Sequence, residues 1–551
     1  MALKNQETGC LSIWQQSVQG AERPILPGNM ETDIVVIGGG LTGILTAYYL
    51  QQSGRECVVL EADHIGSGQT AHTTAKVTSQ HNLIYQKLCR TMGKERAAQY
   101  ADANENAIHR YKELIDKYEI DCDWRECDAY LYTVNDRKNA RALRDEYKYA
   151  KELHLPAELT IRTELPFEVQ QALCFHNQAC FHPLKFLYTM AEKVTVYEQT
   201  KVLEVMPMQE TGKTEEHERN GNVIITNHGT VQAAYVVFAC HYPFVNRPGY
   251  YFLRMHQERS YVLGVECPAC EKQEKQFLKP EHMYLGVDRD ALSFRSAGDI
   301  LLLGGGSHRT GENSSNQYEY LQKYADKYWP ECKVTAKWSA QDCMTLDGIP
   351  YVGRFGSKTS TWYVATGYGK WGMTSSMAAA LLITDLLNGR ENAYADVYSP
   401  RRKTIAASAK TFVTEGKYAA VNILKEKWGR ADTQRGKSGQ SSTQNAGVKY
   451  KGAQNEAVLF QNEVEKMRPE ETKVLEYRGE KVGVYKDKEG EVYIVSVKCP
   501  HLGCLLAWNA DEKSWDCPCH GSRFAYTGEL LDGPAQTGNA CALTGKSKQH
   551  P

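Results

Sequence analysis

Residues 33–61 read DIVVIGGGLTGILTAYYLQQSGRECVVLE, and this stretch decides the fold of the first part of the chain. The apolar run 33–37 is typical of a strand buried on both faces. Residues 38–43 match the pattern G-x-G-x-x-G, and an apolar repeat of helical spacing follows. A second apolar strand ends at Glu61. A strand, a glycine-rich turn and a helix in this order predict a dinucleotide site.

The three glycines and the acidic residue of this pattern each have a physical role. Gly38 makes the tight turn, Gly40 lets backbone N–H groups approach a pyrophosphate, and Gly43 lets helix and strand pack closely. Glu61 stands 18 residues beyond Gly43, where it can accept hydrogen bonds from a ribose hydroxyl. A glycine-rich turn can also be purely structural, but the flanking strand, helix and acid favour the nucleotide. The predicted contacts are Gly38, Gly40, Leu41, Thr42, Gly43 and Glu61.

Composition limits the class of protein. At ~150 residues per domain, 551 residues indicate three or four units. The net charge of −1 gives no indication of binding to nucleic acid or to an anionic membrane. No apolar run approaches the ~18 residues of a membrane span, and residues 1–20 lack the pattern of a secretory signal. Seventeen cysteines then indicate metal ligation or scattered buried thiols in a protein that we expect to be cytoplasmic.

Two further stretches are rich in small residues. Residues 66–75, GSGQTAHTTA, can lie along a flavin or form a flexible surface loop, and composition does not decide between the two. Residues 362–374, WYVATGYGKWGMT, predict a strand and a glycine cluster, followed by a helix over 375–388. The positive end of that helix dipole suits a ring that accepts negative charge, although the loop could simply cap a core helix. Residues 304–306 are three glycines, which we interpret as a turn and not as a second nucleotide site.

With these motifs, residues ~30–395 resemble the D-amino-acid-oxidase and glycine-oxidase superfamily of FAD-dependent oxidoreductases. The resemblance implies FAD in an α/β Rossmann-like domain with an α+β substrate or cap domain. It places the ADP half of FAD at the first glycine turn and the flavin ring near the two small-residue stretches. The contacts that it implies for the ring are Thr70, Thr74, Gly367, Gly369, Gly372, Met373 and Thr374. Residues in segments that resemble those facing the substrate are Arg259, Tyr261, Arg295, His308 and Lys370.

The C-terminal part carries a second motif. Cys499-Pro-His501 and Cys517-Pro-Cys-His520 supply two thiolates and two imidazoles, which is the ligand set of a Rieske 2Fe–2S centre. Alternating strands around 482–496 agree with a small all-β domain. A zinc site from the same residues is the alternative, but the spacing favours the Rieske pattern.

The chain therefore resembles the bacterial flavin oxidoreductases with a C-terminal Rieske domain. In Rieske proteins similar to those of the cytochrome bc complexes, the positions of Cys504 and Cys519 form a disulfide, and we expect the same here. Ser522 and Tyr526 resemble positions that hydrogen-bond the cluster sulfurs, and such bonds raise the reduction potential.

The predicted organisation joins these parts by a linker. Residues 430–447 contain none of Leu, Ile, Val, Met, Phe, Tyr or Trp, and a flexible chain of this length has a reach of ~23 Å. The predicted parts are an arm at 1–28, the oxidoreductase at 29–429, the linker, and the Rieske domain at 448–551. Within the oxidoreductase we assign about 29–90, 155–245 and 336–395 to FAD binding, and about 91–154 and 246–335 to the substrate or cap part.

Two hypotheses about function follow. In the first, FAD oxidises the C–N bond of an amine or amino-acid-like substrate, and electrons pass through the Rieske cluster to an external acceptor, a protein or a quinone. In the second, the chain is an electron-transfer module that is reduced by NAD(P)H or a protein donor and has no metabolite substrate. The absence of a second nucleotide pattern counts against NAD(P)H. A Rieske oxygenase would need a 2-His-1-carboxylate iron site, which the sequence does not indicate.

Overall fold

The structure is a computed structural model that describes residues 11–208, 221–266, 279–290, 292–312, 315–402 and 453–540. The chain forms two compact units, and the first consists of Met1–Ser307 with Gln317–Ala409. The second unit consists of His308–Asn316 with Lys410–Pro551. Each unit is described by itself below.

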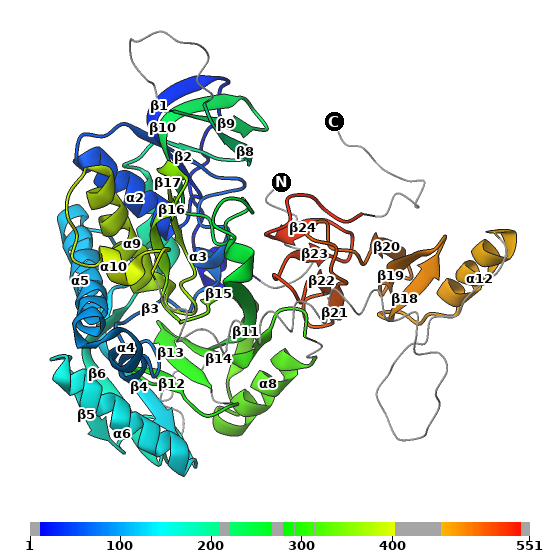
Figure 1. Ribbon diagram of the computed structural model, residues 1–551. Coiled ribbons are helices and arrows are strands. Elements are labelled where there is room, and N and C mark those ends of the chain that lie inside the picture. Colours follow the sequence, from blue (N-terminus) through cyan, green and yellow to red (C-terminus); the bar gives the residue numbers. More distant parts are fainter. Residues whose placement is uncertain are drawn as a thin grey trace, which may run out of the picture. The chain divides into compact units, whose positions relative to one another are not determined.

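The first sheet of the first unit forms around the stretch that opens the chain. Its central strands β10, β1 and β2 are parallel, with Val35 opposite both Val236 and Val58. All three residues are buried, as a strand covered on both faces requires. The strand order is β16-β17-β10-β1-β2-β7, with β9 paired to β10 and β8 to β9. The bounds are β1 Met30–Ile37, β2 Cys57–Leu60, β7 Val196–Tyr197, β8 Val202–Pro207, β9 Asn222–Thr226, β10 Thr230–Phe238, β16 Tyr351–Gly356 and β17 Thr359–Thr366 (Figure 1).

The second sheet of this unit is mostly antiparallel. Its order is β15-β11-β14-β13-β12-β4-β6-β3, and β5 pairs with β6. The longest pairing joins β11 to β15 over their whole length. The bounds are β3 Lys76–Val77, β4 Arg125–Thr133, β5 Ala157–Thr160, β6 Gln171–Cys180, β11 Met255–Glu266, β12 Met283–Gly286, β13 Ser293–Ala297, β14 Ile300–Arg309 and β15 Lys333–Thr345.

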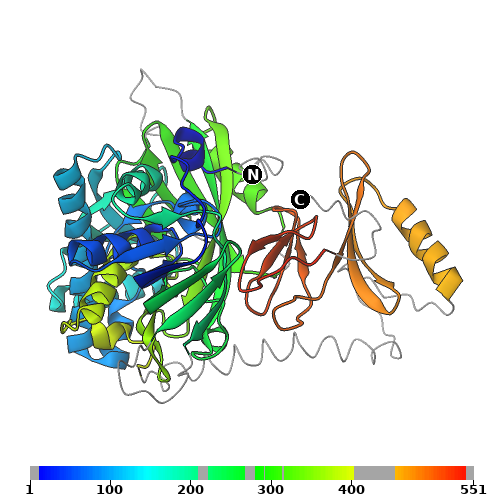
Figure 2. The same ribbon diagram turned by 90° about the horizontal axis from the view of Figure 1, so that it is seen from above.

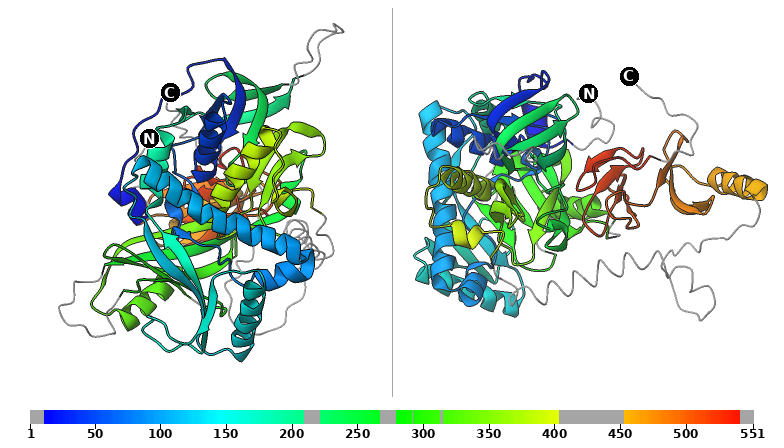
Figure 3. Two further views of the ribbon diagram at one scale, coloured as in Figure 1. Left: turned by 90° about the vertical axis from the view of Figure 1, so that its left-hand side faces the viewer. Right: turned by 45° about the horizontal axis from the view of Figure 1, so that its top comes forward.

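Helices complete the first unit, and α2, α5 and α9 pack together on one side of it (Figure 2, Figure 3). Helix α9 is buried along most of its length, and its small residues Ser375–Ala380 allow α2 to approach closely. The bounds are α1 Ile13–Ser17, α2 Leu41–Gln52, α3 Gln69–His72, α4 Tyr85–Met92, α5 Lys94–Tyr118, α6 Arg137–Glu152, α7 Pro183–Ala191, α8 Gln317–Tyr328, α9 Gly372–Leu387 and α10 Ala395–Tyr398.

The second unit contains two small antiparallel sheets, in the orders β18-β19-β20 and β21-β22-β23-β24. Its core gathers Trp515 and Phe524 with the buried cysteines of the ligand loops. The bounds are α12 Ala453–Glu465, β18 Thr472–Tyr477, β19 Glu480–Lys486, β20 Val492–Ser496, β21 Ala507–Asn509, β22 Ser514–Asp516, β23 Arg523–Ala525 and β24 Leu530–Asp532. The all-β domain expected from the alternating pattern is therefore confirmed, with one helix before it.

The structure differs from the sequence predictions at one place. The glycines 304–306 lie inside strand β14 and do not form a turn, since Gly304 pairs with Ser293 of β13. A Cβ atom on Gly305 would lie 2.8 Å from Leu292, so close packing across the sheet explains the small residue.

The ranges that we assign to FAD binding contain strands of both sheets. Strands β3, β5 and β6 and most of β15 belong to the second sheet, although their residues fall within 29–90, 155–245 and 336–395. The division of the flavin domain into FAD-binding and substrate parts stays a prediction.

Two other expectations from the sequence concern the linker and membrane-spanning segments. The linker predicted at 430–447 lies outside the described residues. Among the residues that the structure describes, no helix has both the length and the apolar character needed to cross a membrane.

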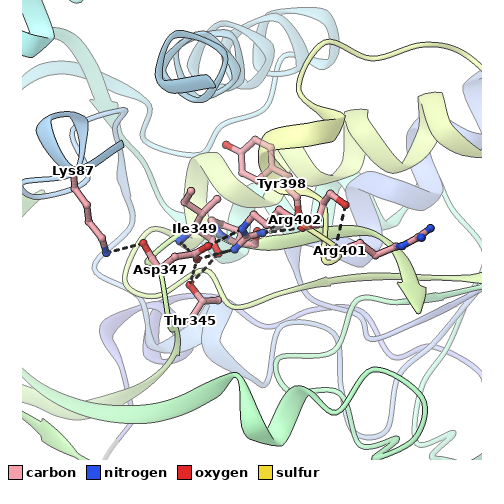
Figure 4. A network of polar contacts seen from close by, with 9 residues as sticks. Lys87, Thr345, Asp347, Ile349, Tyr398, Arg401 and Arg402 are labelled. Atoms are coloured by element: carbon pink, nitrogen blue, oxygen red, sulfur yellow. Dashed lines mark hydrogen bonds and ion pairs between the residues drawn. The ribbon is translucent and has the colours of Figure 1, made fainter. Parts of the chain in front are cut away.

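A buried ion pair fixes the end of the described part of the first unit (Figure 4). Arg402 donates from Nε and Nη2 to the two carboxylate oxygens of Asp347, each at 2.7 Å. Their side chains are only 3% and 5% exposed. The guanidinium also donates to the carbonyl oxygens of Ile349 at 2.7 Å and Pro350 at 2.9 Å. This network holds the segment after α10 against the turn between β15 and β16.

We expect Arg402→Ala to lower the free energy of unfolding of the first unit by about 3–5 kcal/mol, because it leaves the Asp347 carboxylate buried and unpaired. Denaturant titration followed by tryptophan fluorescence measures this. The matched control is Arg401→Ala, since the neighbouring Arg401 is exposed and its backbone N–H, which the substitution keeps, donates to Ser399 Oγ at 3.2 Å. Equal stability of the two variants would contradict the role given to the ion pair.

Candidate cofactor sites

The glycine turn between β1 and α2 has the geometry that a pyrophosphate needs. Gly38 has a φ of +113°, which favours glycine, and its N–H donates to the carbonyl of Leu60 at 2.9 Å. A Cβ atom on Gly43 would lie 1.8 Å from the Gly38 carbonyl oxygen, so only glycine permits this approach of helix to strand. Gly40 is the N-cap of α2, and a Cβ there would lie 3.3 Å from Thr70 Oγ1. The open N-terminus of α2 thus fits an anionic phosphate group.

Glu61 lies at the end of β2, beside this turn. Its Oε2 accepts a hydrogen bond from the Gly39 N–H at 2.6 Å, and its Oε1 accepts one from the Asp63 N–H at 2.9 Å. Burial raises the pKa of Glu61, and these two N–H groups oppose the shift. The carboxylate is therefore held at the end of the strand where the fold places the ribose.

The first glycine turn and the later glycine cluster come together in space. Thr42 Oγ1 lies 3.0 Å from the Tyr368 hydroxyl and donates to Ser376 Oγ at 3.1 Å. Gly367 and Gly369 have φ values of +76° and +55°, so this turn depends on glycine at both positions. Residues about 330 positions apart thus form one site, as the predicted FAD contacts require.

The segment 70–75 is fixed by buried donors from other elements, and it is not a loose surface loop. Trp14 Nε1 donates to the Thr73 carbonyl at 2.7 Å, and Trp338 Nε1 donates to the His72 carbonyl at 2.9 Å. Arg295 Nη1 donates to the carbonyls of Thr74 at 2.8 Å and Ala75 at 2.7 Å. Arg295, which the sequence placed near the substrate, therefore holds the backbone of this segment.

Residues 371–374 are anchored by His81, which the sequence analysis missed. The His81 ring stacks on Trp371 with centroids 4.8 Å apart, and its Nε2 lies 3.0 Å from Thr374 Oγ1. Its Nδ1 lies 2.6 Å from the Tyr100 hydroxyl. Burial lowers the pKa of His81 to about 3, so the ring is neutral. Tyr111 completes the anchor by donating to the Met373 carbonyl at 2.9 Å.

Arg259 lies in a buried polar cluster on β11 and β15. The guanidinium donates to Ser339 Oγ and, from Nη1, to Gln341 Oε1 at 3.5 Å. Gln341 also donates to Gln257, and all four side chains are buried. The Gln341 N–H donates to Gln69 Oε1 at 2.9 Å, which joins this cluster to the start of α3. The cluster therefore adjoins the segment at which we expect the flavin ring.

Lys370 forms a charged cluster at the second glycine turn. Its Nζ lies 2.8 Å from Asp342 Oδ2 and 3.5 Å from Glu258 Oε2. Burial alone would lower the pKa of Lys370, but the two carboxylates raise it above its ordinary value. Burial would likewise raise the pKa of Glu258, but the hydrogen bond with His256 and the charge of Lys370 lower it to about 2. Glu258 and Lys370 are therefore both charged at neutral pH.

The remaining two substrate-facing candidates are Tyr261 and His308. Tyr261 is fully buried in an apolar cluster and packs edge-on against Tyr318 with ring centroids 5.1 Å apart. It stands two residues after Arg259 on β11 and pairs with Ser339, which accepts a hydrogen bond from Arg259. His308 belongs to the short segment His308–Asn316, which groups with the second unit. A substrate contact for either residue stays a prediction.

The second unit places the predicted iron ligands on two loops. The first loop closes with the Gly503 N–H donating to the Cys499 carbonyl at 2.9 Å, and the second with the Gly521 N–H donating to the Cys517 carbonyl at 2.9 Å. The rings of His501 and His520 meet edge-on, with centroids 5.0 Å apart. Two buried thiols and two adjacent imidazoles match the donor set of a Rieske cluster.

The surroundings of this site suit the cluster. Cys504 and Cys519 form a disulfide that joins the two loops, which confirms the expected pairing. Burial lowers the pKa of His501 to about 4 and that of His520 to about 3, so both rings are in the neutral form that binds metal. The Ser522 hydroxyl interacts with the Cys499 sulfur, and the hydrogen bonds of Ser522 and Tyr526 to the cluster sulfurs stay a prediction.

Several residues around these sites escaped the sequence analysis, although some carried a signal. Gln257 stands two residues before the predicted Arg259 in one strand, so the two share one face, and a polar residue at that spacing from Arg259 could have been recognised. The partners Ser339, Gln341 and Asp342 could not, because only the β11–β15 register brings them opposite.

We expect Gly40→Val to remove FAD, because its branched side chain would fill the space in front of the α2 N-terminus. Gly40→Ala should weaken binding less, since one methyl group meets only Thr70 Oγ1 at 3.3 Å. The flavin absorbance per protein after gel filtration measures both variants. Full flavin occupancy in Gly40→Val would contradict the assignment of the pyrophosphate site.

We expect the stability that Glu258 contributes to depend on pH. Because its pKa in the folded protein is about 2, below its ordinary value of 4.5, the contribution is fully present above pH 4.5 and is lost as the pH falls towards 2. Denaturant unfolding of the wild type and Glu258→Gln at several pH values measures the difference. A difference in stability that does not shrink below pH 4.5 would rule out this account of the cluster.

Comparison with known proteins agrees with both sites. The family model described as FAD dependent oxidoreductase (DAO) matches residues 33–386, and the one described as Rieske [2Fe-2S] domain matches residues 457–543. The Rieske 2Fe-2S iron-sulfur protein YhfW of Bacillus subtilis is 34% identical over 535 residues, which are 95% of this chain and 96% of that protein.

Two further relatives match about two thirds of this chain. The gamma-glutamylputrescine oxidoreductase of Escherichia coli is 26% identical over 65% of this chain and 84% of its own length. The crystal structure of glycine oxidase from Geobacillus kaustophilus has the same fold, with a TM-score of 0.53 at 20% identity over 68% of this chain and 99% of that one. The chain therefore belongs to the DAO family of FAD-dependent oxidoreductases, and it carries a Rieske 2Fe–2S domain after the flavin domain.

Proposed function

We propose that the protein oxidises the C–N bond of an amine or amino-acid-like substrate at FAD and passes the electrons through its Rieske cluster to an external protein or quinone. Oxidation of a C–N single bond removes two electrons and two protons from the substrate and leaves an imine. When bound, FAD supplies the change from two-electron to one-electron chemistry, and the cluster carries single electrons.

The observation that carries this proposal is that one polypeptide contains both a DAO-type flavin domain and a Rieske ligand set. A flavin domain that handed its electrons directly to O₂ would have no use for a one-electron centre. Rieske potentials of about −150 to +300 mV lie well above the values near −400 mV of plant-type ferredoxins, so the cluster suits an electron acceptor.

Arg259 supports the substrate class. A guanidinium can bind a carboxylate through two parallel hydrogen bonds, and the Arg259 guanidinium is held in place by Ser339 and Gln341. Its cluster adjoins the segment expected beside the flavin ring through Gln341 and Gln69. Two relatives carry the names of an amine derivative and an amino acid, gamma-glutamylputrescine and glycine. Together these points favour a substrate with an amine and a carboxylate.

The second candidate function is the electron-transfer module that NAD(P)H or a protein donor reduces. It requires a surface for the donor and no substrate pocket. The buried Arg259 cluster favours the first proposal, since an arginine that adjoins the segment expected along the flavin suits a carboxylate-bearing substrate, whereas a donor surface does not require it.

Anaerobic mixing of the purified protein with a panel of amines and amino acids, and separately with NADH and NADPH, distinguishes the two. We expect an amine or amino acid to bleach the flavin absorbance and the nicotinamides to leave it unchanged. Reduction by a nicotinamide alone would favour the module and overturn the substrate class.

Two variants sharpen this test. Arg259→Lys keeps a charge but loses the planar fork, so we expect a higher KM for a carboxylate-bearing substrate and little change for an amine without one. Lys327→Arg, an exposed cation on α8, is the matched control and should leave both unchanged. An equal loss for both kinds of substrate would mean that Arg259 only stabilises the fold.

A further inference from the structure

A second group of metal-ligating side chains lies in the flavin domain and shares no residue with either cofactor site. We propose that Asp128, Cys174 and His176 bind a divalent transition-metal ion, with Zn²⁺ as the metal that the donor set fits best. Their ligand atoms all lie within 4.8 Å of one another. Nitrogen, sulfur and oxygen donors in this combination are those found in zinc sites.

The register of the second sheet explains why these residues converge. Cys174 and His176 stand two apart on β6, so both side chains point to the same face. Tyr130 of β4 pairs with Cys174, and Asp128 stands two residues before Tyr130 on the same face. The register shifts between Cys127 and Ala129, where Asp128 alone stands opposite His176 and Asn177 of β6, at a bulge of β6.

The spacing of the three donor atoms matches one face of a tetrahedral site. Cys174 Sγ lies 3.6 Å from both Asp128 Oδ2 and His176 Nδ1, and His176 Nδ1 lies 3.0 Å from Asp128 Oδ2. With Zn–S near 2.3 Å and Zn–N or Zn–O near 2.0–2.1 Å, ligand atoms in a tetrahedral site stand about 3.3–3.6 Å apart. A shift of about 0.4 Å in one side chain is therefore enough to hold zinc.

Neighbouring groups are arranged as outer partners of such a site. Glu158 of β5, which pairs with Cys174, places Oε2 3.4 Å from His176 Nε2 and so orients the ring with Nδ1 towards the other donors. Tyr130 hydrogen-bonds the Cys174 sulfur, and the Asp128 N–H donates to His282 Nδ1 at 3.1 Å. These bonds fix the carboxylate and the thiol before a metal arrives.

Two of the three side chains are partly exposed to solvent, so an ion can enter the site and a water molecule can be its fourth ligand. The side chain of His176 is 40% exposed and that of Asp128 is 24% exposed, whereas Cys174 is buried. Water can therefore reach the site from one side and complete the coordination. Binding of Zn²⁺ forms bonds to the thiolate sulfur, the imidazole nitrogen and the carboxylate oxygen, and releases the thiol proton to solvent. The alternative is a structural Asp–His ion pair beside a buried cysteine. It gives no reason for the Cys174 sulfur to lie 3.6 Å from both the Asp128 carboxylate and the His176 ring.

The test uses the full-length protein with both cofactors bound. The protein is treated with EDTA, dialysed against micromolar Zn²⁺, and its zinc and iron are measured together by mass spectrometry. We expect one zinc per chain in the wild type, none in Cys174→Ser and His176→Gln, and the same iron content in all three. The unchanged iron content shows that the Rieske ligands are not the source of the zinc.

A matched control variant and a second measurement distinguish metal binding at this site from a general effect of removing a buried thiol. Cys122→Ser removes another buried thiol of the same unit and should retain the zinc. Co²⁺ in place of Zn²⁺ should give a thiolate-to-metal absorption band in the difference spectrum of wild type against Cys174→Ser. If the wild type binds no zinc, or if Cys174→Ser and His176→Gln both bind as much as the wild type, the proposal is wrong.

Discussion

The close approach of helix α2 to strand β1 is the contact on which the flavin domain depends. Gly43 meets the carbonyl of Gly38 so tightly that any side chain would overlap it. Because the helix packs this closely, its N-terminal N–H groups lie at the end of the sheet, where they suit an anionic phosphate group. The same placement lets Thr42 reach Tyr368 and Ser376, so the two glycine-rich turns of the chain become one site.

Rigidity around that site comes from buried polar groups that belong to distant parts of the sequence. Trp14, Trp338 and Arg295 hold the segment expected along the flavin, and His81 holds the turn before α9. The Asp347–Arg402 pair fastens the end of the domain to the turn that precedes β16. Removing any one of these donors leaves a buried carbonyl or carboxylate without its partner, which is costly inside a protein. The polar groups therefore preserve the geometry of the site.

Much of this architecture could be predicted from the sequence because it depends on local patterns. Glycines at fixed spacing, apolar runs and Cys-x-His motifs report directly on turns, strands and ligands. What escaped prediction depends on pairing between distant strands. The register of β11 with β15 creates the Arg259 and Lys370 clusters, and the pairing of β4 with β6, with a bulge of β6 opposite Asp128, brings Asp128 to Cys174 and His176. The glycines of β14 were interpreted as a turn because close packing across a sheet and chain reversal both favour small residues.

The central claim is that electrons taken by the flavin leave through the Rieske cluster of the same chain. Rapid freeze-quenching after anaerobic mixing with a reducing substrate, followed by electron paramagnetic resonance, tests it most directly. The account predicts that the Rieske signal rises after the flavin bleaches, at a rate per chain that does not depend on protein concentration. A cluster that stays oxidised while the flavin is fully reduced would contradict it.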